Sequence, residues 1–219
     1  MPLEYEHSFY NFNKDEIISK IKKNGFNLKG SFLFKVQIFK HPLNTEKTYI
    51  RVRDEGHRIT LTFKLLSEKG FDNEMEVNVD NFDSTVNILE KLGCSKKYYY
   101  EKIREIWEKD HTEIVFDTNP GNPERMEVES TTKDDLNKIL KILNLNSSMH
   151  DDSNKYMELF GIEIPKDIDL KFSSLEKDLV PHVKKNKELF LKLVKEQVKK
   201  YKNLFSKKKI KKYTRILKN

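Results

Sequence analysis

Apolar and polar residues alternate with a period of two through most of the first 130 positions. Successive side chains of a strand point to opposite faces, so each stretch predicts a strand with one apolar and one polar face. Glu4 and Glu6, for example, share one face, and Leu3, Tyr5 and Phe9 share the other. The predicted strands cover residues 2–9, 31–40, 49–54, 58–65, 74–79, 98–107, 112–117 and 127–129.

Helical spacing interrupts this alternation. Asn13 can cap a helix that Gly25 ends, and Thr132 with Asp135 resembles a capping box. Each helix has an apolar stripe to bury, so we expect the helices to cover the apolar face of the sheet. The predicted helices cover residues 14–24, a segment from Asp80 or Asn81 to near Gly93, a segment that opens near Thr132, and a pattern from Ser174 onward that Pro181 opens or kinks.

The charged faces of the strands fall into two sets of opposite sign. The ordinary interpretation of such alternation is an open sheet with one face exposed to solvent. The recurrence of Arg and Glu in pairs two residues apart favours a closed or nearly closed antiparallel β-barrel instead. We therefore predict an α+β fold with a charged lumen and helices packed outside. The basic set is Arg51, Arg53, Lys64, Lys102 and Arg104, and the acidic set is Glu4, Glu6, Glu74, Glu76, Asp117, Glu127 and Glu129.

Like charges in a lumen are costly unless a ligand or a metal neutralises them. Carboxylates suit Mg²⁺ or Mn²⁺, and Arg and Lys suit phosphate oxygens. The two sets together indicate a site for a polyphosphate and its metal. For Glu74 and Glu76 an alternative stays open, because they can also pair with Arg51 or Arg104 and hold the barrel closed.

Residues 2–161 resemble the CYTH domain of the triphosphate tunnel metalloenzymes, whose strands have Glu-x-Glu-x-Lys, Arg-x-Arg, Thr-x-Lys, Glu-x-Glu, Lys-x-Arg, an Asp and a closing Glu-x-Glu in this order. The segment Lys155–Leu159 is similar to the family's terminal Ser-Tyr segment. The matching positions are Glu4-Tyr5-Glu6, Arg51-Val52-Arg53, Thr62-Phe63-Lys64, Glu74-Met75-Glu76, Lys102-Ile103-Arg104, Asp117 and Glu127-Val128-Glu129.

The resemblance implies roles for these residues. Arg51, Arg53, Lys64, Lys102 and Arg104 would bind the triphosphate. Glu4, Glu6, Glu127 and Glu129 would bind one or two divalent metals, Mg²⁺ or Mn²⁺, with assistance from Asp117. Glu4, Glu6, Lys64 and Arg104 would be catalytic, with Glu74 and Glu76 as supporting carboxylates. Ser8 replaces the lysine of the family's opening motif, and Lys29 or Lys35 is a candidate substitute.

Three functions are consistent with this resemblance. The leading hypothesis is a metal-dependent triphosphatase that hydrolyses inorganic triphosphate or a nucleoside or RNA 5′-triphosphate. The second is a class IV adenylyl cyclase, which makes cyclic AMP and pyrophosphate from ATP. The third, motivated by Ser8, is a non-catalytic module that binds triphosphate or RNA.

Charge divides the chain unevenly. From residue 180 onward there are 15 Lys and Arg against two Glu, whereas the rest has 27 basic and 33 acidic residues. We predict a tunnel domain at residues 1–162 and a basic, mainly helical extension at 163–219. The extension either packs on the barrel through its apolar stripe or binds a polyanion such as nucleic acid, an acidic partner or an anionic membrane surface.

Cysteine content and hydropathy suggest the compartment. Cys94 is the single cysteine, which excludes a disulfide within the chain. The sequence contains neither a CxxC nor an HExxH motif, so no zinc site is predicted. No signal or membrane-spanning pattern is visible, so a cytoplasmic location is expected. The oligomeric state stays open.

Overall fold

A computed structural model describes residues 5–42, 48–67, 70–145, 158–163 and 168–206, without the side chains of 66–74 and 205–206. Its centre is an eight-stranded antiparallel sheet in the order β1-β8-β7-β6-β2-β3-β4-β5. The strands are β1 Tyr5–Phe9, β2 Asn27–Lys40, β3 Thr48–Asp54, β4 Ile59–Ser67, β5 Gly70–Val79, β6 Ser95–Lys109, β7 Thr112–Thr118 and β8 Arg125–Ser130.

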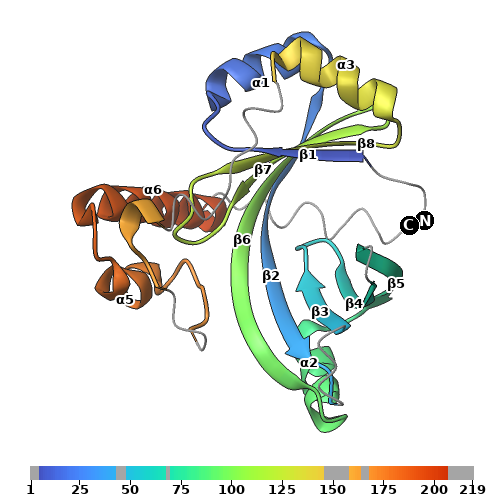
Figure 1. Cartoon of the computed structure of the whole chain (residues 1–219), viewed down its shortest axis with the longest axis vertical. Helices are drawn as coiled ribbons and strands as arrows, with labels where there is room; N and C mark the ends of the chain where they lie inside the picture. The colour runs from blue at the N-terminus through green and yellow to red at the C-terminus, as the bar shows by residue number, and fades with distance from the viewer. Residues whose placement is uncertain (1–4, 43–47, 68–69, 146–157, 164–167, 207–219) are drawn as a thin grey trace.

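The long strands β2 and β6 bend the sheet into an incomplete barrel (Figure 1). They pair along nearly their whole length, with register shifts between Leu28 and Gly30 and between Ile38 and Phe39. Such irregularities increase the local bend of a strand. Strands β1 and β5 are the two edges, and no ladder joins them in the described part of the chain. The predicted α+β class and nearly closed antiparallel barrel are confirmed.

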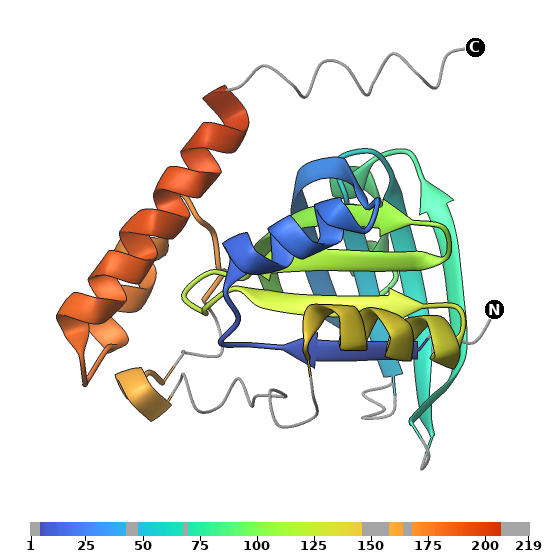
Figure 2. The same cartoon turned by 90° about the horizontal axis from the view of Figure 1, so that it is seen from above.

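Helices cover the convex side of the sheet (Figures 1 and 2). Asn13, Asn81 and Thr132 cap α1, α2 and α3, because each side chain accepts a hydrogen bond from the backbone N–H three residues on. The described helices are α1 Lys14–Lys23, α2 Phe82–Lys91, α3 Lys133–Leu143, α5 Leu175–Leu179, the short 3₁₀ helix η2 Val180–His182, and α6 Lys187–Ser206.

Three apolar clusters join these helices to the sheet. Phe116, Met126 and Val128 of β7 and β8 pack beneath α1 and α3. Val52 and its neighbours on β3 pack against α2, and Ile103 of β6 contacts the cluster of α5 and α6. Burying one large apolar side chain stabilises a fold by about 1.5–3 kcal/mol, so these three clusters contribute strongly to the folding energy. The concave face carries the charged side chains together with some buried apolar ones, among them Phe34, Val36 and Ile38 of β2.

Coverage of the apolar face is less complete than the sequence predicts. Met75 and Val77 are 60% and 56% exposed because β5 is an edge strand beyond the reach of α2. Helical spacing would also place Leu92 on the apolar stripe of the predicted helix that ends near Gly93. Leu92 is instead 69% exposed, because it lies just after the last residue of α2.

The extension also differs from the predicted single helical pattern. Pro181 lies inside η2, and α6 starts only after Asn186, which has a left-handed φ of 49°. Both α5 and α6 pack on the sheet, as one of the two predictions for the extension requires. The division at residue 162 stays a proposal. Among the described helices, none is long and apolar enough to cross a membrane.

Candidate functional site

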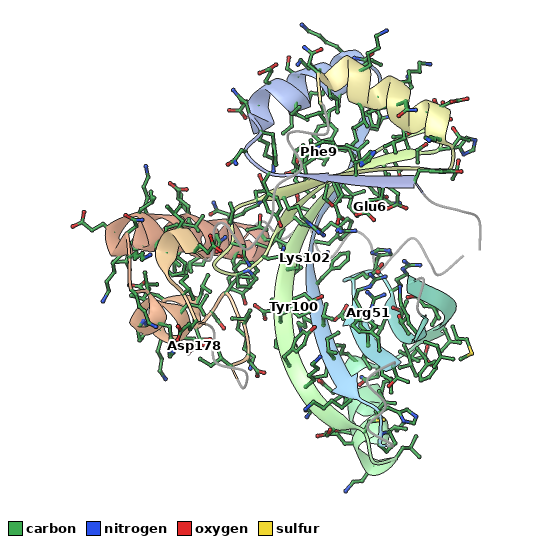
Figure 3. The ribbon with its side chains drawn as sticks, in the orientation of Figure 1. Glu6, Phe9, Arg51, Tyr100, Lys102 and Asp178 are labelled. Atoms are coloured by element: carbon green, nitrogen blue, oxygen red, sulfur yellow. The ribbon has the colours of Figure 1, made fainter. Side chains whose placement is uncertain are left out.

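The concave face of the sheet, called the lumen below, gathers the charged residues of seven strands. Residues directly opposite each other in a ladder point to the same face. Arg104 lies opposite Asp117, which lies opposite Arg125, and Glu127 lies opposite Ser8. Figure 3 shows Glu6, Lys102 and Arg51 around this side of the molecule.

Asp117 is the most buried acid of the lumen, with no exposed surface. Lys102 Nζ contacts it at 2.9 Å, and Arg104 binds both of its oxygens at 2.7 and 2.6 Å. Arg104 also donates to Glu127 at 2.6 Å, and Arg125 contacts Glu127. Burial would raise the pKa of Asp117, but the contacts with Arg104 and Lys102 outweigh burial and lower it. Burial dominates at Glu127 and raises its pKa, against Arg104 and Arg125.

A row of carboxylates crosses the lumen beside this cluster. Glu6 pairs in register with Glu129, and Glu129 with Glu113, across β1, β8 and β7. Burial raises the pKa of Glu113, although Arg104 opposes this. Ser8 Oγ donates to Glu6 at 3.3 Å, so the residue that replaces the family lysine lies in this row. Like charges directly opposite each other are destabilising, so the row has the character of a cation site.

No metal centre is preformed by the described residues, because no three His, Cys, Asp or Glu side chains among them converge closely enough. The donor chemistry nevertheless fits a hard divalent cation, since Glu6, Glu113 and Glu129 offer only carboxylate oxygens. Glu4, the other predicted ligand of β1, lies outside the described residues. The metal assignment of these residues therefore remains a proposal.

The opposite wall of the lumen, on β3 to β5, is basic. Glu76 accepts from Thr62 at 2.7 Å and lies 3.5 Å from Arg51 and 3.8 Å from Arg53. Arg53 also pairs with Glu55 at 2.5 Å. Burial would raise the pKa of Glu76, but Thr62, Arg53 and Arg51 lower it. Glu76 thus takes the ion-pairing role that the sequence left open.

Four buried polar atoms have no hydrogen-bond partner among the described residues. They are Nε of Arg51, Nε of Arg53, Nε of Arg125 and Oγ1 of Thr60. Three of them lie on adjacent lumen positions, because Thr60 pairs in register with Arg53 and Arg51 lies two residues away. A buried donor without a partner is costly, so these groups are candidates for hydrogen bonds to an anionic ligand.

Phe34 lies between the two walls at the base of the lumen. Arg53, Lys102 and Arg104 lie 5.9, 5.4 and 5.7 Å from its ring centroid. These distances are those of cation–π contacts. One aromatic ring therefore bridges cations of β3 and β6 and links the basic wall to the Asp117 cluster.

Most predicted site residues come together in the lumen. Lys64 lies on the lumen face, in register with Tyr49 and Glu74. The side chain of Glu74 is not among the described ones. Lys35 pairs in register with Glu101 and Asp54 on the convex face, so it is not a substitute for the missing lysine. Lys29 pairs with Glu108 at 3.0 Å. The predicted residues that the structure brings to the lumen are Glu6, Arg51, Arg53, Lys64, Glu76, Lys102, Arg104, Asp117, Glu127 and Glu129.

Four lumen residues were not predicted as site residues. Glu113 and Arg125 alternate with apolar neighbours on β7 and β8, so strand parity alone could have placed them in the lumen. Thr60 shares the polar face of its strand with Thr62 and Lys64 by the same alternation. Glu55 belongs to a turn, where no periodicity predicts which way a side chain points.

Known proteins share this arrangement of strands. The CYTH domain family model matches residues 10–160. A Methanocaldococcus jannaschii protein, "Putative adenylate cyclase MJ0240", is 26% identical over 166 residues, covering 68% of this chain and 94% of that protein.

Two solved structures support the fold. The PH1012 protein of Pyrococcus horikoshii has a TM-score of 0.57 at 20% identity, covering 72% of this chain and 99% of that one. A "putative adenylate cyclase" of Vibrio parahaemolyticus has a TM-score of 0.58 at 16% identity, covering 71% and 97%. Since the family match extends over well over half of the sequence, the chain belongs to the CYTH domain family.

Proposed function

We propose that the chain is a divalent-metal-dependent triphosphatase that acts on a triphosphate bound in the lumen. The observation that carries the proposal is a set of buried donors on Arg51, Arg53, Arg125 and Thr60 that have no partner among the described residues. They lie on the same concave face as a carboxylate row. Guanidinium and hydroxyl donors suit phosphate oxygens, and carboxylates suit the metal that accompanies a polyphosphate.

In this mechanism Arg51, Arg53 and Lys64 bind and orient the phosphates from the basic wall. Arg104, held by Asp117 and Glu127, offsets the negative charge that develops during phosphoryl transfer. Lys102 is anchored on the same Asp117 and adds a second positive charge.

The metal would be held by Glu6, Glu129 and, as the resemblance predicts, Glu4 and Glu127, with Asp117 assisting. A bound Mg²⁺ or Mn²⁺ activates water and neutralises phosphate charge. In hydrolysis the oxygen of a water molecule would bond to the terminal phosphorus while the bond from that phosphorus to the bridging oxygen breaks. The water would release a proton to solvent, and phosphate and the shortened chain would leave.

A class IV adenylyl cyclase is the second candidate, favoured by the names of the two relatives above. The same lumen would bind ATP, the ribose 3′-hydroxyl would attack the α-phosphorus, and pyrophosphate would leave. A non-catalytic binder is the third candidate, because Ser8 replaces the family lysine and hydrogen-bonds Glu6. Cytoplasmic location and nucleic-acid binding by the tail remain predictions, and residues 207–219 lie outside the description.

One assay separates the three functions. The full chain is incubated with Mg²⁺ or Mn²⁺ and tripolyphosphate, ATP or 5′-triphosphate RNA, and phosphate, pyrophosphate and cyclic AMP are measured. Phosphate release without cyclic AMP supports the triphosphatase, whereas cyclic AMP with pyrophosphate from ATP identifies a cyclase. A rise in melting temperature without any product identifies a binder.

Two variants place the activity in the lumen. Arg53→Gln should abolish most turnover, because it removes a donor of the basic wall. Lys96→Gln is the matched control, since Lys96 pairs with Glu90, away from the lumen charges. Millimolar tripolyphosphate with Mg²⁺ that left the wild-type melting temperature unchanged would exclude a lumen site, because a hundredfold excess over Kd stabilises by about 2.7 kcal/mol.

A further inference from the structure

Helix α6 lies beyond the part of the chain that the CYTH model matches, yet it contacts the turn between β7 and β8. This turn, residues 119–124, connects Asp117 near the end of β7 to Arg125 at the start of β8. In Figure 1, α6 lies beside the sheet at the level of β7.

Gln197 of α6 binds the turn through three backbone groups. Its Oε1 accepts from Gly121 N at 2.9 Å, and its Nε2 donates to Asn119 O at 3.1 Å and to Asn122 O at 2.6 Å. The side chain is 4% exposed. A single buried amide thus satisfies a compact turn that would otherwise leave these groups unpaired.

Lys200, almost one helical turn further on, binds both ends of the same connection. Its Nζ donates to Thr118 Oγ1 at 2.6 Å and to Glu124 Oε1 at 2.5 Å. Lys14 of α1 reaches the same Glu124 oxygen at 3.0 Å. Burial would raise the pKa of Glu124, but Lys200 and Lys14 outweigh it and lower the pKa.

Thr118 and Glu124 directly adjoin two residues of the lumen. Thr118 follows Asp117, and Glu124 precedes Arg125, which lies 3.8 Å from Asp117 and contacts Glu127. A movement of the turn therefore changes the relative position of Asp117, Arg125 and Glu127. The basic wall of Arg51 and Arg53 lies on β3, and among the described residues its ion pairs are with Glu55 and Glu76 rather than with this turn.

We propose that Gln197 and Lys200 are positioning residues, through which the helix outside the family match holds the acidic cluster of the lumen in its working geometry. The proposal rests on the proposed function. Docking of α6 alone does not require these polar contacts, because Phe190 and Val194 are fully buried in the apolar cluster beneath it. Since apolar packing supplies the attachment, the polar contacts set where the turn lies.

The test compares Gln197→Met and Lys200→Met with Lys199→Met in the full chain. Lys199 is exposed on the same helix, so its variant removes the same charge as Lys200→Met without touching the turn. We measure kcat and KM for tripolyphosphate with Mg²⁺, together with the melting temperature. Because misplacement by about 1 Å can cost roughly a hundredfold in rate, we expect kcat to fall at least about tenfold in both turn variants.

A KM within about threefold of wild type is expected, because Arg51, Arg53 and Thr60, three of the four proposed phosphate donors, lie on β3 and β4 away from this turn. Lys200→Arg, which can still reach Glu124, should recover most of kcat, and Lys199→Met should match wild type. If kcat stays at the wild-type value while only the melting temperature falls, the contacts are merely structural and the proposal is overturned.

Hydrogen exchange distinguishes a failure of the positioning proposal from a failure of the proposed function. In Gln197→Met, amides of β7 and β8 should lose protection along with the turn. If protection is lost in the turn alone, positioning fails even where turnover is measurable. If the wild-type protein turns over no triphosphate, the proposed function fails, and the exchange experiment still decides the positioning question.

Discussion

Asp117 shows how the lumen balances buried charge at a single residue. Three cationic side chains lie within 4 Å of a carboxylate that has no exposed surface. Removing one partner of a buried ion pair leaves the others uncompensated, which usually costs more than the pair contributes. Thr60 shows the opposite situation, a buried hydroxyl with no partner among the described residues.

Asp117→Asn should destabilise the protein by about 3 kcal/mol, because Lys102 and Arg104 lose their shared counter-ion. The pKa of Asp117 is lowered from its ordinary 3.8, so its stabilising effect is complete above that value and is lost as the pH falls through the lowered one. Urea unfolding between pH 3 and 6 should show a flatter pH dependence in the variant. An equally steep dependence would contradict this assignment.

Thr60→Val should leave the melting temperature unchanged or raise it, because valine has the same shape and removes an unsatisfied hydroxyl. The Kd for tripolyphosphate should rise about tenfold, since a hydrogen bond to a charged group contributes about 1.5 kcal/mol or more. Thr62→Val is the control on the same face. Thr62 donates to Glu76, so its variant should be destabilised. Unchanged tripolyphosphate affinity in Thr60→Val would remove Thr60 from the site.

Among the elements, the turn between β7 and β8 is held closely by both α5 and α6. Gly121 in this turn has a φ of 76°, and a Cβ there would lie 2.5 Å from Leu179 Cδ1. Glycine therefore serves both the left-handed backbone and the close approach of α5.

Gly121→Ala should cost about 2–4 kcal/mol, of which about 1–2 comes from the backbone and the rest from overlap with Leu179. Gly56→Ala is the matched control, because Gly56 has a φ of 84° but its nearest atoms lie 3.9 Å away. The difference between the two denaturation free energies measures the overlap. Equal values would show that α5 gives way freely at this contact.

Elements also differ in how well the sequence predicts them. The faces of β3, β7 and β8 follow directly from alternation, and the helix caps follow from Asn13, Asn81 and Thr132. The start of β2 was predicted four residues late. Gly30 and the register shift beside it break the alternation of apolar and polar residues at this end, although the backbone of β2 still pairs with β6.

The candidate site was predictable only in part, for the same reason. Alternation placed Arg51, Arg53 and Glu129 on the polar face but does not say which side chains pair. The pairing of Glu76 with Arg51 depends on register across β3, β4 and β5. The contacts of Gln197 depend on how α6 packs, because nothing local distinguishes this glutamine from an exposed one.

At the scale of the whole molecule, charge is separated between a barrel and its extension. Helix α6 contacts the barrel by its buried stripe, and its exposed residues include Lys192, Lys195 and Lys199. The basic residues after Phe205 extend this excess of positive charge further along the sequence. Barrel chemistry and polyanion binding are thus expected to be separable by truncation.

Truncation after Phe205 should spare tripolyphosphate hydrolysis, because it keeps Gln197 and Lys200 and removes only residues beyond Phe205. RNA binding should weaken, and its salt dependence should flatten by roughly 0.7 in the log–log slope for each phosphate that the tail no longer neutralises. The measurements are the hydrolysis rate, the melting temperature and the RNA affinity at several salt concentrations. An unchanged slope would exclude nucleic-acid binding by the tail, and a joint decrease of melting temperature and rate would indicate packing on the barrel.

The internal ion pairs of the lumen make ligand binding an exchange of partners. A triphosphate alone would draw the cationic side chains away from Asp117 and Glu127 and leave these carboxylates without counter-ions. A metal bound alone to these carboxylates would leave the arginines without theirs. Only the two together give new partners to the cations and to the carboxylates at once. Metal and anion should therefore bind the lumen tightly only in each other's presence. Linkage then requires that Mg²⁺ tighten tripolyphosphate binding by the same factor by which tripolyphosphate tightens Mg²⁺ binding.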